Sequence, residues 1–343
     1  MKKTTFLYII LSISLASCIK DKNDVDIPSA SFSVPMNFPA PVYNFDKNPI
    51  TNAGFALGKK LFYDGRLSRD GSISCGDCHQ QSAGFAHADH RVSHGVDNQL
   101  GTRNSPALFN LAWQNTFFWD GGVHDLDLFS ISPIENPIEM DEKMPNVIKK
   151  LQSDNSYPSM FQNAFGTNEI NGTRTFQALS QFMNMLVSSN SKYDRYKRGE
   201  AAIILSSDEL SGLALVQEKC QSCHKGELFS DFSFRNNGVG AGKDVGRALI
   251  TLNQEDNYKF KVPSLRNLGY SSPYMHNGRF LNLDAVLNHY SNEIKGSPTL
   301  DVALQNGNVN GIVLTEKEKK DIIAFLNTLN DETFIKDKRF SEF

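Results

Sequence analysis

Apolar residues recur at helical spacing in two well-marked stretches, each preceded by a helix-capping pattern. Ser206 with Glu209 and Thr315 with Glu318 have the spacing of a capping box, in which each side chain bonds the other residue's backbone N–H. The apolar positions that follow are Leu210, Leu213 and Ala214 in one stretch, and Ile322, Leu326 and Leu329 in the other. A weaker apolar pattern covers residues 55–62. These patterns predict one helix ending near residue 220, a late helix packed across it, and a counterpart in the first half.

The stretches between these elements have no clear periodicity. Residues 95–106 and 238–246 are rich in Gly, Asn and Pro, which is typical of long loops. We therefore expect a mainly α protein with long connecting loops and little strand. About 290 residues follow residue 49, enough for two domains of ordinary size, which we place at 50–200 and 201–343.

The N-terminus has the pattern of an export signal. Two lysines follow Met1, residues 6–15 are apolar, and small residues precede Cys18. The pattern predicts a lipoprotein signal peptide at 1–17, with Cys18 acylated as the mature N-terminus; an ordinary signal peptide with a stray cysteine is the alternative. Residues 18–49 are rich in Ser, Pro and Asn and predict a flexible tether between membrane and body.

The charge balance is mildly acidic. The formal net charge is −3, and removing the two lysines of the signal segment makes it about −5. Since the chain has no basic tract, nucleic acid is not an expected partner. The expected location is the periplasm or outer envelope, with the lipid anchor as the only membrane contact. A mildly acidic surface also suits a basic protein partner.

Two Cys-x-x-Cys-His pentapeptides carry the strongest chemical signal. In this motif two thiols can attach a c-type haem and the adjacent histidine becomes the proximal iron ligand. A redox dithiol or a zinc half-site is the alternative, but the first lacks a βαβ context and the second needs closer pairs. The pattern predicts two covalent haems. Their residues are Cys75, Cys78 and His79 in the first motif, and Cys220, Cys223 and His224 in the second.

Further elements follow in a fixed order. They are His94-Gly95, Arg103-Asn104-Ser105-Pro106, Phe118-Trp119-Asp120-Gly121, Asn136-Pro137-Ile138-Glu139-Met140 and Pro273-Tyr274-Met275-His276-Asn277-Gly278. Together with the two haem motifs, this order resembles the bacterial di-haem cytochrome c peroxidases and their relatives of the MauG type, from about residue 54 to 329. The resemblance implies two cytochrome c-like helical domains, each with one haem.

The resemblance also implies residue roles. Peroxide would be cleaved at the N-terminal haem, with Glu139 as the catalytic carboxylate that moves a proton between the two peroxide oxygens. Trp119 would carry electrons between the haems; simple packing is the alternative for any tryptophan. Glu135 and Trp113 have no such match and are expected to be structural. Phe129 stands where relatives often have a glutamine, which implies a drier pocket.

The resting ligand of the first haem is less well marked. His94 falls where many of these peroxidases have a histidine that closes the sixth iron site in the resting state. The flanking loop lengths depart from the usual pattern. His87 or His90, or no histidine at all, therefore remain alternatives.

The sixth ligand of the second haem divides the family. The peroxidases have a methionine about fourteen residues after the late motif's histidine, whereas the MauG type has a tyrosine, and here the position is Tyr290. Met275 precedes that histidine and is not expected to ligate. A phenolate stabilises ferric iron, whereas a thioether raises the potential. Ligation by His289 or water is the alternative.

A calcium ion between the haems is common in the family. The matching positions are Asn104 through its side-chain oxygen, and Ser271 and Pro273 through backbone carbonyls. Turn chemistry could also explain the asparagine. His276 is expected to lie near the haems without ligating them.

These observations leave three functions to separate. The first is a peroxidase that reduces hydrogen peroxide to water with electrons from a periplasmic donor such as a small cytochrome c. The second is a MauG-like enzyme that oxidises a protein or small-molecule substrate through high-valent haem. The third is a non-catalytic di-haem electron carrier. Relatives are often dimers, so a homodimer is an expected assembly.

Overall fold

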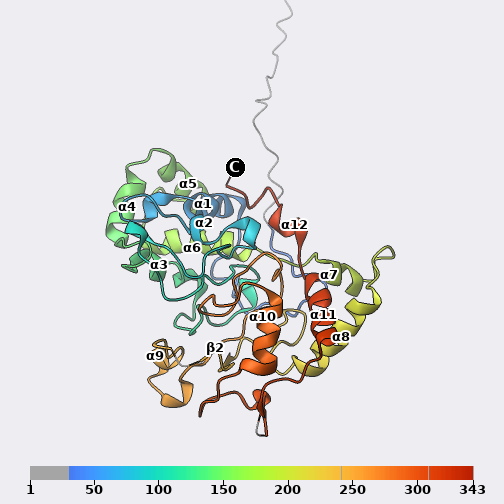
Figure 1. Ribbon diagram of the computed structural model, residues 1–343. Coiled ribbons are helices and arrows are strands. Elements are labelled where there is room, and N and C mark those ends of the chain that lie inside the picture. The colour runs from blue at the N-terminus through green and yellow to red at the C-terminus, as the bar shows by residue number, and fades with distance from the viewer. Residues whose placement is uncertain (1–30, 241, 308, 343) are drawn as a thin grey trace, which may run out of the picture.

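The computed structural model describes residues 31–240, 242–307 and 309–342; the proposed signal segment and Cys18 lie outside them. Helices dominate the described chain and strands are two residues long, so the prediction of a mainly α protein with little strand is confirmed (Figure 1). The α-helices are α1 (Asn52–Phe62), α2 (Cys75–Cys78), α3 (Ile131–Glu135), α4 (Met144–Gln152), α5 (Ser156–Phe165), α6 (Gly172–Asn184), α7 (Lys192–Lys197), α8 (Ser207–Lys219), α9 (Ala248–Thr251), α10 (Leu283–Asn288), α11 (Glu316–Asn327) and α12 (Glu332–Ile335).

The strands form two short antiparallel pairs. They are β1 (Phe234–Arg235) with β2 (Phe260–Lys261), and β3 (Gln305–Asn306) with β4 (Val309–Asn310). Short 3-10 turns occur at Gly65–Leu67, Gln81–Ala83, Val96–Asn98, Leu111–Trp113, Leu126–Leu128, Gln254–Asp256 and Val302–Leu304, and a π turn, η7, at His289–Glu293. Among the described residues, no helix is long and apolar enough to cross a membrane.

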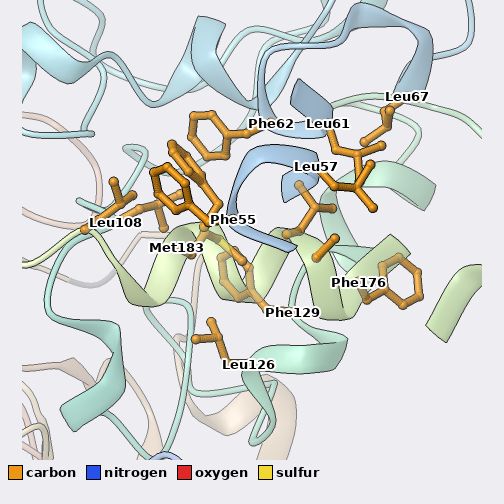
Figure 2. Packing of buried hydrophobic residues seen from close by; sticks show 14 of the residues in the cluster. Phe55, Leu57, Leu61, Phe62, Leu67, Leu108, Leu126, Phe129, Phe176 and Met183 are labelled. Atoms are coloured by element: carbon orange, nitrogen blue, oxygen red, sulfur yellow. The ribbon is translucent and has the colours of Figure 1, made fainter. Parts of the chain in front are cut away.

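The first half is organised around α1 and α6, which cross closely (Figure 1). The crossing is close because Gly58 has no side chain; a Cβ there would lie 1.9 Å from the carbonyl oxygen of Ala178. Figure 2 shows the aromatic and aliphatic side chains that fill the space around this crossing. Phe334 and Phe340, from the end of the chain, join this same core. The C-terminal segment therefore packs against the core of the first half.

In the second half, α8 and α11 cross closely in the same way. Both predicted capping boxes are present, Ser206 with Glu209 and Thr315 with Glu318, and the helices begin directly after them. Gly212 lies at the crossing, where a Cβ would lie 2.0 Å from the carbonyl oxygen of Asp321. The prediction of a late helix packed across the helix before the second motif is thus confirmed.

An internal repeat that the helical pattern does not reveal relates the two halves. Pro106 to Leu111 and Pro263 to Leu268 share the pattern Pro-x-Leu-x-Asn-Leu, and Trp119-Asp120-Gly121 corresponds to His276-Asn277-Gly278 at the same separation. The backbone follows the repeat: Asn110 and Asn267 both have positive φ, at 54° and 60°. Trp119 and His276 therefore occupy equivalent places in the two halves.

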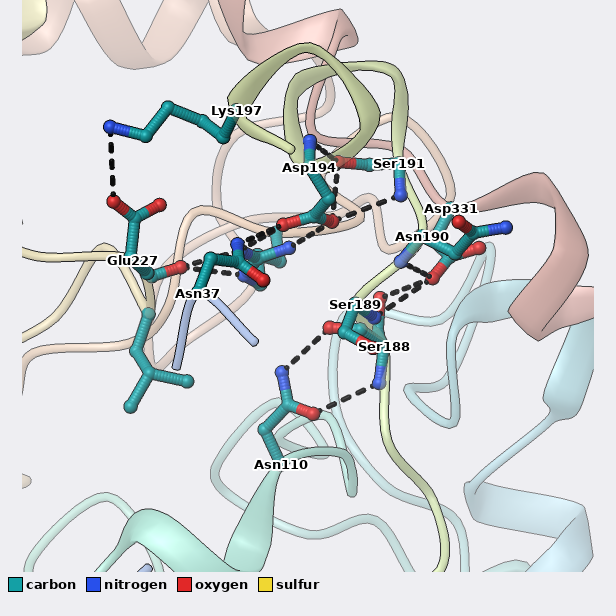
Figure 3. Close-up of polar contacts among 12 residues, drawn as sticks. Asn37, Asn110, Ser188, Ser189, Asn190, Ser191, Asp194, Lys197, Glu227 and Asp331 are labelled. Carbon is teal, nitrogen blue, oxygen red and sulfur yellow. Dashed lines mark hydrogen bonds and ion pairs between the residues drawn. The ribbon is translucent and has the colours of Figure 1, made fainter. Parts of the chain in front are cut away.

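The halves meet at the segment around Ser188 (Figure 3). Its backbone is held by Asn110, which donates to the Ser188 carbonyl at 3.1 Å and accepts from the Ser188 N–H at 2.9 Å. Asn267, the repeat partner of Asn110, donates to the Ser188 hydroxyl at 2.9 Å. The two equivalent asparagines thus fasten both halves to one connecting segment.

A buried ion pair lies at this junction. Arg266 has no exposed side-chain surface and binds both carboxylate oxygens of Asp194 at 2.8 Å. Asn37 donates to the same carboxylate at 3.0 Å. Because the guanidinium and the carboxylate are both hydrogen-bonded, part of the cost of burying the two charges is offset.

The expected flexible tether needs correction over residues 31–49. Phe38 is buried and packs edge-on against Trp113, with ring centroids 5.1 Å apart. Asn48 is buried as well and exchanges hydrogen bonds with Ser180 and Gln181 of α6. Composition suggested a loose segment, but these few apolar and amide side chains find partners on the body. Trp113 itself is a packing residue, as expected.

Candidate active site

Two cavities lie beside the two Cys-x-x-Cys-His motifs. The first cavity contains about 1560 Å³ of atom-free space, partly open to solvent, and is lined by the first motif, His94, Trp119 and Glu139. The second cavity contains about 1940 Å³, also partly open, and is lined by the second motif, Trp119 and Tyr290. Each motif thus faces its own space, and the two spaces share a wall.

The histidines of both motifs are held in the same way. The Nδ1 atom of His79 lies 3.0 Å from the carbonyl oxygen of Phe85, and that of His224 lies 3.1 Å from the carbonyl oxygen of Phe229. A carbonyl only accepts, so Nδ1 carries the hydrogen and Nε2 is left to bind a metal. Burial lowers the pKa of His79 to about 4 and lowers that of His224, which keeps both rings in the neutral, ligating form.

The four motif cysteines form no disulfide bond with one another. Burial raises the pKa of Cys75 to about 12 and that of Cys220 to about 11, so both are neutral at physiological pH. Neutral thiols on the wall of a largely apolar cavity, next to an oriented imidazole, fit a c-type haem better than a zinc ion, which needs thiolates. The residues present therefore fit one haem in each cavity.

Glu139 lines the first cavity at the end of a short turn after α3. Burial raises the pKa of its carboxyl group, while a hydrogen bond from Asn136 Nδ2 to Oε1, at 2.8 Å, opposes the rise. Gly95 lets the loop that carries His94 approach closely, because a Cβ there would lie 2.4 Å from the Glu139 carbonyl oxygen. Glu135 does not line the cavity; it binds Lys143 and the backbone N–H of Met144.

Trp119 belongs to the wall shared by both cavities. Its Nε1–H donates to the carbonyl oxygen of Asn104 at 2.8 Å, and its own carbonyl accepts from Lys261 N–H at 2.7 Å. Its ring meets His276 edge-on at a centroid distance of 6.5 Å, and His276 stacks on Phe260 at 3.5 Å. These contacts fix the indole between the two cavities.

Phe129 also belongs to the shared wall. It is buried and stacks on Phe118 with ring centroids 4.7 Å apart. No hydrogen-bond donor is therefore available from this side chain, in line with the drier pocket that the sequence predicts.

His87, His90 and His94 form a cluster, with ring centroids of 4.3 Å between the first two and 4.7 Å between the last two. Of the three, only His94 is part of the first cavity's lining. The Sγ–H of Cys78 donates to the His94 carbonyl oxygen at 3.5 Å, which ties this loop to the first motif. His87 is buried instead, with no hydrogen-bond partner for Nδ1 in the structure.

Tyr290 lies in η7 and lines the second cavity. Burial raises the pKa of its hydroxyl to about 12, and Asn237 Nδ2 lies 3.4 Å from that oxygen and lowers the pKa in part. The same amide lies 3.2 Å from the sulfur of Met275, which also lines the cavity. His289 is turned to the Asn237 carbonyl oxygen, 3.0 Å from its Nε2, and does not line the cavity.

The three residues expected to bind calcium, Asn104, Ser271 and Pro273, all line the second cavity. Asn104 Nδ2 lies 3.4 Å from the carbonyl oxygens of His90 and Arg91. In the described part of the chain, no three or more His, Cys, Asp or Glu side chains form a group that could hold a metal ion. The calcium site uses none of these residue types and stays a prediction.

Two features of the site were missed by sequence reasoning. Asn136 belongs to the same motif as Glu139, and its place three residues earlier could have marked it as the carboxylate's partner. Arg103 binds Asp244 through two nitrogens, at 2.6 and 2.8 Å, and Asp120 at 2.5 Å. This cluster joins the two halves beside the cavities, and no local pattern pairs residues so far apart.

Two cavities, each with an imidazole set to bind iron, define a helical di-haem protein. A family model described as di-haem cytochrome c peroxidase matches residues 52–202. The methylamine utilization protein MauG of Methylorubrum extorquens is 36% identical over 328 residues, which cover 92% of this chain and 88% of that protein. The cytochrome c551 peroxidase of Nitrosomonas europaea is 34% identical over 292 residues, covering 82% and 81%.

A solved structure agrees with these relatives. The crystal structure of a MauG-like protein associated with microbial copper homeostasis has a TM-score of 0.82 and 30% identity, covering 91% of this chain and 99% of that one. The chain therefore belongs to the family of di-haem cytochrome c peroxidases and MauG proteins. The family that the motifs predicted is confirmed, and with it the expectation of two haems.

Proposed function

We propose that this protein is a c-type di-haem peroxidase that reduces hydrogen peroxide to water. The observation that carries the proposal is Glu139, a carboxyl group of raised pKa that lines the first cavity together with the motif of His79. A non-catalytic electron carrier has no use for such a group, so it is the weakest of the three functions.

The residues would divide the work as follows. Cys75, Cys78 and His79 would hold the first haem, which would supply iron for binding peroxide and exchanging electrons with it. Glu139 takes the proton from the near oxygen and returns it to the departing oxygen. Oε2 is the atom available for this transfer, since Oε1 accepts the bond from Asn136. The raised pKa makes this carboxylate a better proton acceptor than an exposed glutamate.

Electrons would enter through the second half and pass the shared wall. Cys220, Cys223 and His224 would hold the second haem, which would supply an acceptor for electrons from a small cytochrome c. Trp119 is supported as the relay by its place in both cavity walls and by its fixed indole. His94 is the proposed resting ligand of the first haem, and Asn104, Ser271 and Pro273 the proposed calcium ligands. The proposed setting is the periplasm or outer envelope, with the lipid on Cys18 as anchor.

A MauG-like oxidase is the second candidate, favoured by Tyr290. Tyr290 lines the second cavity, and a phenolate ligand would make the haem there a poorer electron acceptor. Such an enzyme would use peroxide to oxidise a protein or small-molecule substrate. The two candidates differ in one observable: a cytochrome c peroxidase with His94 bound at rest turns over only after one-electron reduction, whereas the second candidate reacts with peroxide while fully oxidised.

Steady-state peroxide consumption by the haem-loaded protein, with reduced cytochrome c as donor, tests the proposal. Glu139→Gln removes the proton acceptor while keeping the size of the side chain, so turnover should fall by about 10²–10⁴-fold with both haems retained. Glu135→Gln is the matched control, because this carboxylate lies outside the cavity, and it should keep wild-type turnover. Equal turnover in Glu139→Gln and wild type would remove Glu139 from the mechanism.

A further inference from the structure

Five cationic side chains line the two cavities, and four of them have a carboxylate partner. Arg103 pairs with Asp120 and Asp244, Lys219 with Glu218 and Glu318, Arg235 with Asp231 and Asp301, and Arg266 with Asp194. The fifth is Lys261. Among the described residues, no carboxylate lies within ion-pair distance of its ammonium group. The second cavity therefore has one cation whose charge the protein does not balance locally.

The contacts of Lys261 are all with neutral groups. Its Nζ donates to Gln114 Oε1 and to the Thr116 carbonyl oxygen, both at 2.7 Å. The ammonium also lies 5.8 Å from the centre of the Phe117 ring. Burial lowers the pKa of this ammonium to about 7, and the more distant Asp120 opposes that shift. A shielded ammonium with two neutral acceptors still has a third N–H to donate and a charge to balance.

The position of Lys261 in the structure indicates which kind of anion could balance its charge. Its backbone N–H donates to the Trp119 carbonyl, so the residue sits at the wall between the two cavities. The motif cysteines of the second half line the same cavity. A haem attached to those cysteines carries two propionate carboxylates on the edge remote from its thioether bonds, and a propionate is the anion that such a cofactor brings with it.

We propose that Lys261 binds a propionate carboxylate of the haem in the second cavity. This inference rests on the proposed occupancy of that cavity by a haem. The ion pair completes the charge balance of the cavity and holds a positive charge near the iron. A nearby cation disfavours the ferric state relative to the ferrous state, so Lys261 raises the reduction potential of this haem. That effect opposes the lowering expected from a phenolate ligand.

The test is a spectroelectrochemical titration of both haems in the full-length, haem-loaded protein. Lys261→Gln keeps a donor for the neutral acceptors but removes the charge, so it should make the midpoint potential of one haem more negative and leave the other unchanged. Lys261→Arg should restore the wild-type value. Lys219→Gln is the matched control in the same cavity; its cation already has carboxylate partners, so its shift should be clearly smaller.

Gln114→Ala separates anchoring from a structural role. It removes a neutral partner of Lys261 and keeps the charge, so the potentials should not move. If Lys261→Gln does not fold, Gln114→Ala still tests the proposal, because a shift of the haem potentials in this variant would contradict it. Unchanged potentials in Lys261→Gln, or a Gln114→Ala shift as large as that of Lys261→Gln, would overturn the proposal. Haem content by intact mass is measured first, since a wild-type protein with one haem would refute the occupancy of the second cavity rather than the role of Lys261.

Discussion

At the scale of single residues, the environment of Glu139 sets when this carboxyl group can accept a proton. Burial favours the neutral acid, and the Asn136 amide favours the carboxylate by donating to Oε1. The balance leaves the pKa above that of an exposed glutamate. The proposed peroxide cleavage needs the ionised form, so its rate should fall on the acid side as pH drops through this raised pKa.

Asn136→Ala should move this acid limb to higher pH. Without the amide, the carboxylate loses the donor that stabilises it, and the pKa of Glu139 rises further. The measurement is the pH profile of kcat/KM for peroxide. Asn146→Ala removes an equivalent amide from Glu142, a carboxylate outside the cavity, and should leave the profile in place. A limb that stays, or moves to lower pH, in Asn136→Ala contradicts this account.

The amide of Asn237 lies close to both the Tyr290 hydroxyl and the Met275 sulfur, so these two groups are neighbours in the second cavity. Substituting each in turn tests which of them is the iron ligand. If the phenol oxygen ligates the second haem, Tyr290→Phe removes the sixth ligand and should change the absorption spectrum of one haem only. Met275→Leu removes the neighbouring sulfur and should leave the spectrum unchanged. The reverse pattern would assign the ligand to Met275, and an unchanged spectrum in both variants would leave neither as ligand.

At the scale of elements, each half is built on a close helix crossing that depends on one glycine. The caps that begin α8 and α11 are local, and sequence spacing predicted them correctly. The crossings are not local: nothing near Gly212 shows that the Asp321 carbonyl will lie against it. The same holds for α1 and α6, where Gly58 meets Ala178.

Gly212→Ala should destabilise the protein, although alanine is the better helix former. The new methyl group would need the 2.0 Å approach to the Asp321 oxygen to open, and such overpacking costs about 1–3 kcal/mol. Gly172→Ala in α6 is the matched control, because a Cβ at this position would lie 3.8 Å from the nearest atoms, an ordinary contact distance. This variant should be neutral or stabilising by up to about 1 kcal/mol. Apparent melting temperatures of the haem-loaded variants measure both, and equal values would show that the crossing tolerates a methyl group.

At the scale of the whole molecule, the two halves are related by an internal repeat, and equivalent segments of the repeat are hydrogen-bonded to each other. Asn104 donates its backbone N–H to the His276 carbonyl, and Lys261 donates to the Trp119 carbonyl, both at 2.7 Å. In the repeat, Asn104 corresponds to Lys261, and Trp119 corresponds to His276. The wall between the cavities is therefore built from equivalent loops of both halves, which places Trp119 beside both proposed haems.

The sequence by itself determined the two Cys-x-x-Cys-His motifs, the capped helices, the helical class and the family, because each depends on residues within a few positions of one another or on motif order. The expected flexible segment was wrong over residues 31–49, since the partners of Phe38 and Asn48 lie far along the chain. Only the tertiary structure decided which of three histidines lines the first cavity, how Trp119 is held, and which cation lacks an anion. Those properties arise from burial and from contacts between distant segments, and spacing along the chain does not encode them locally.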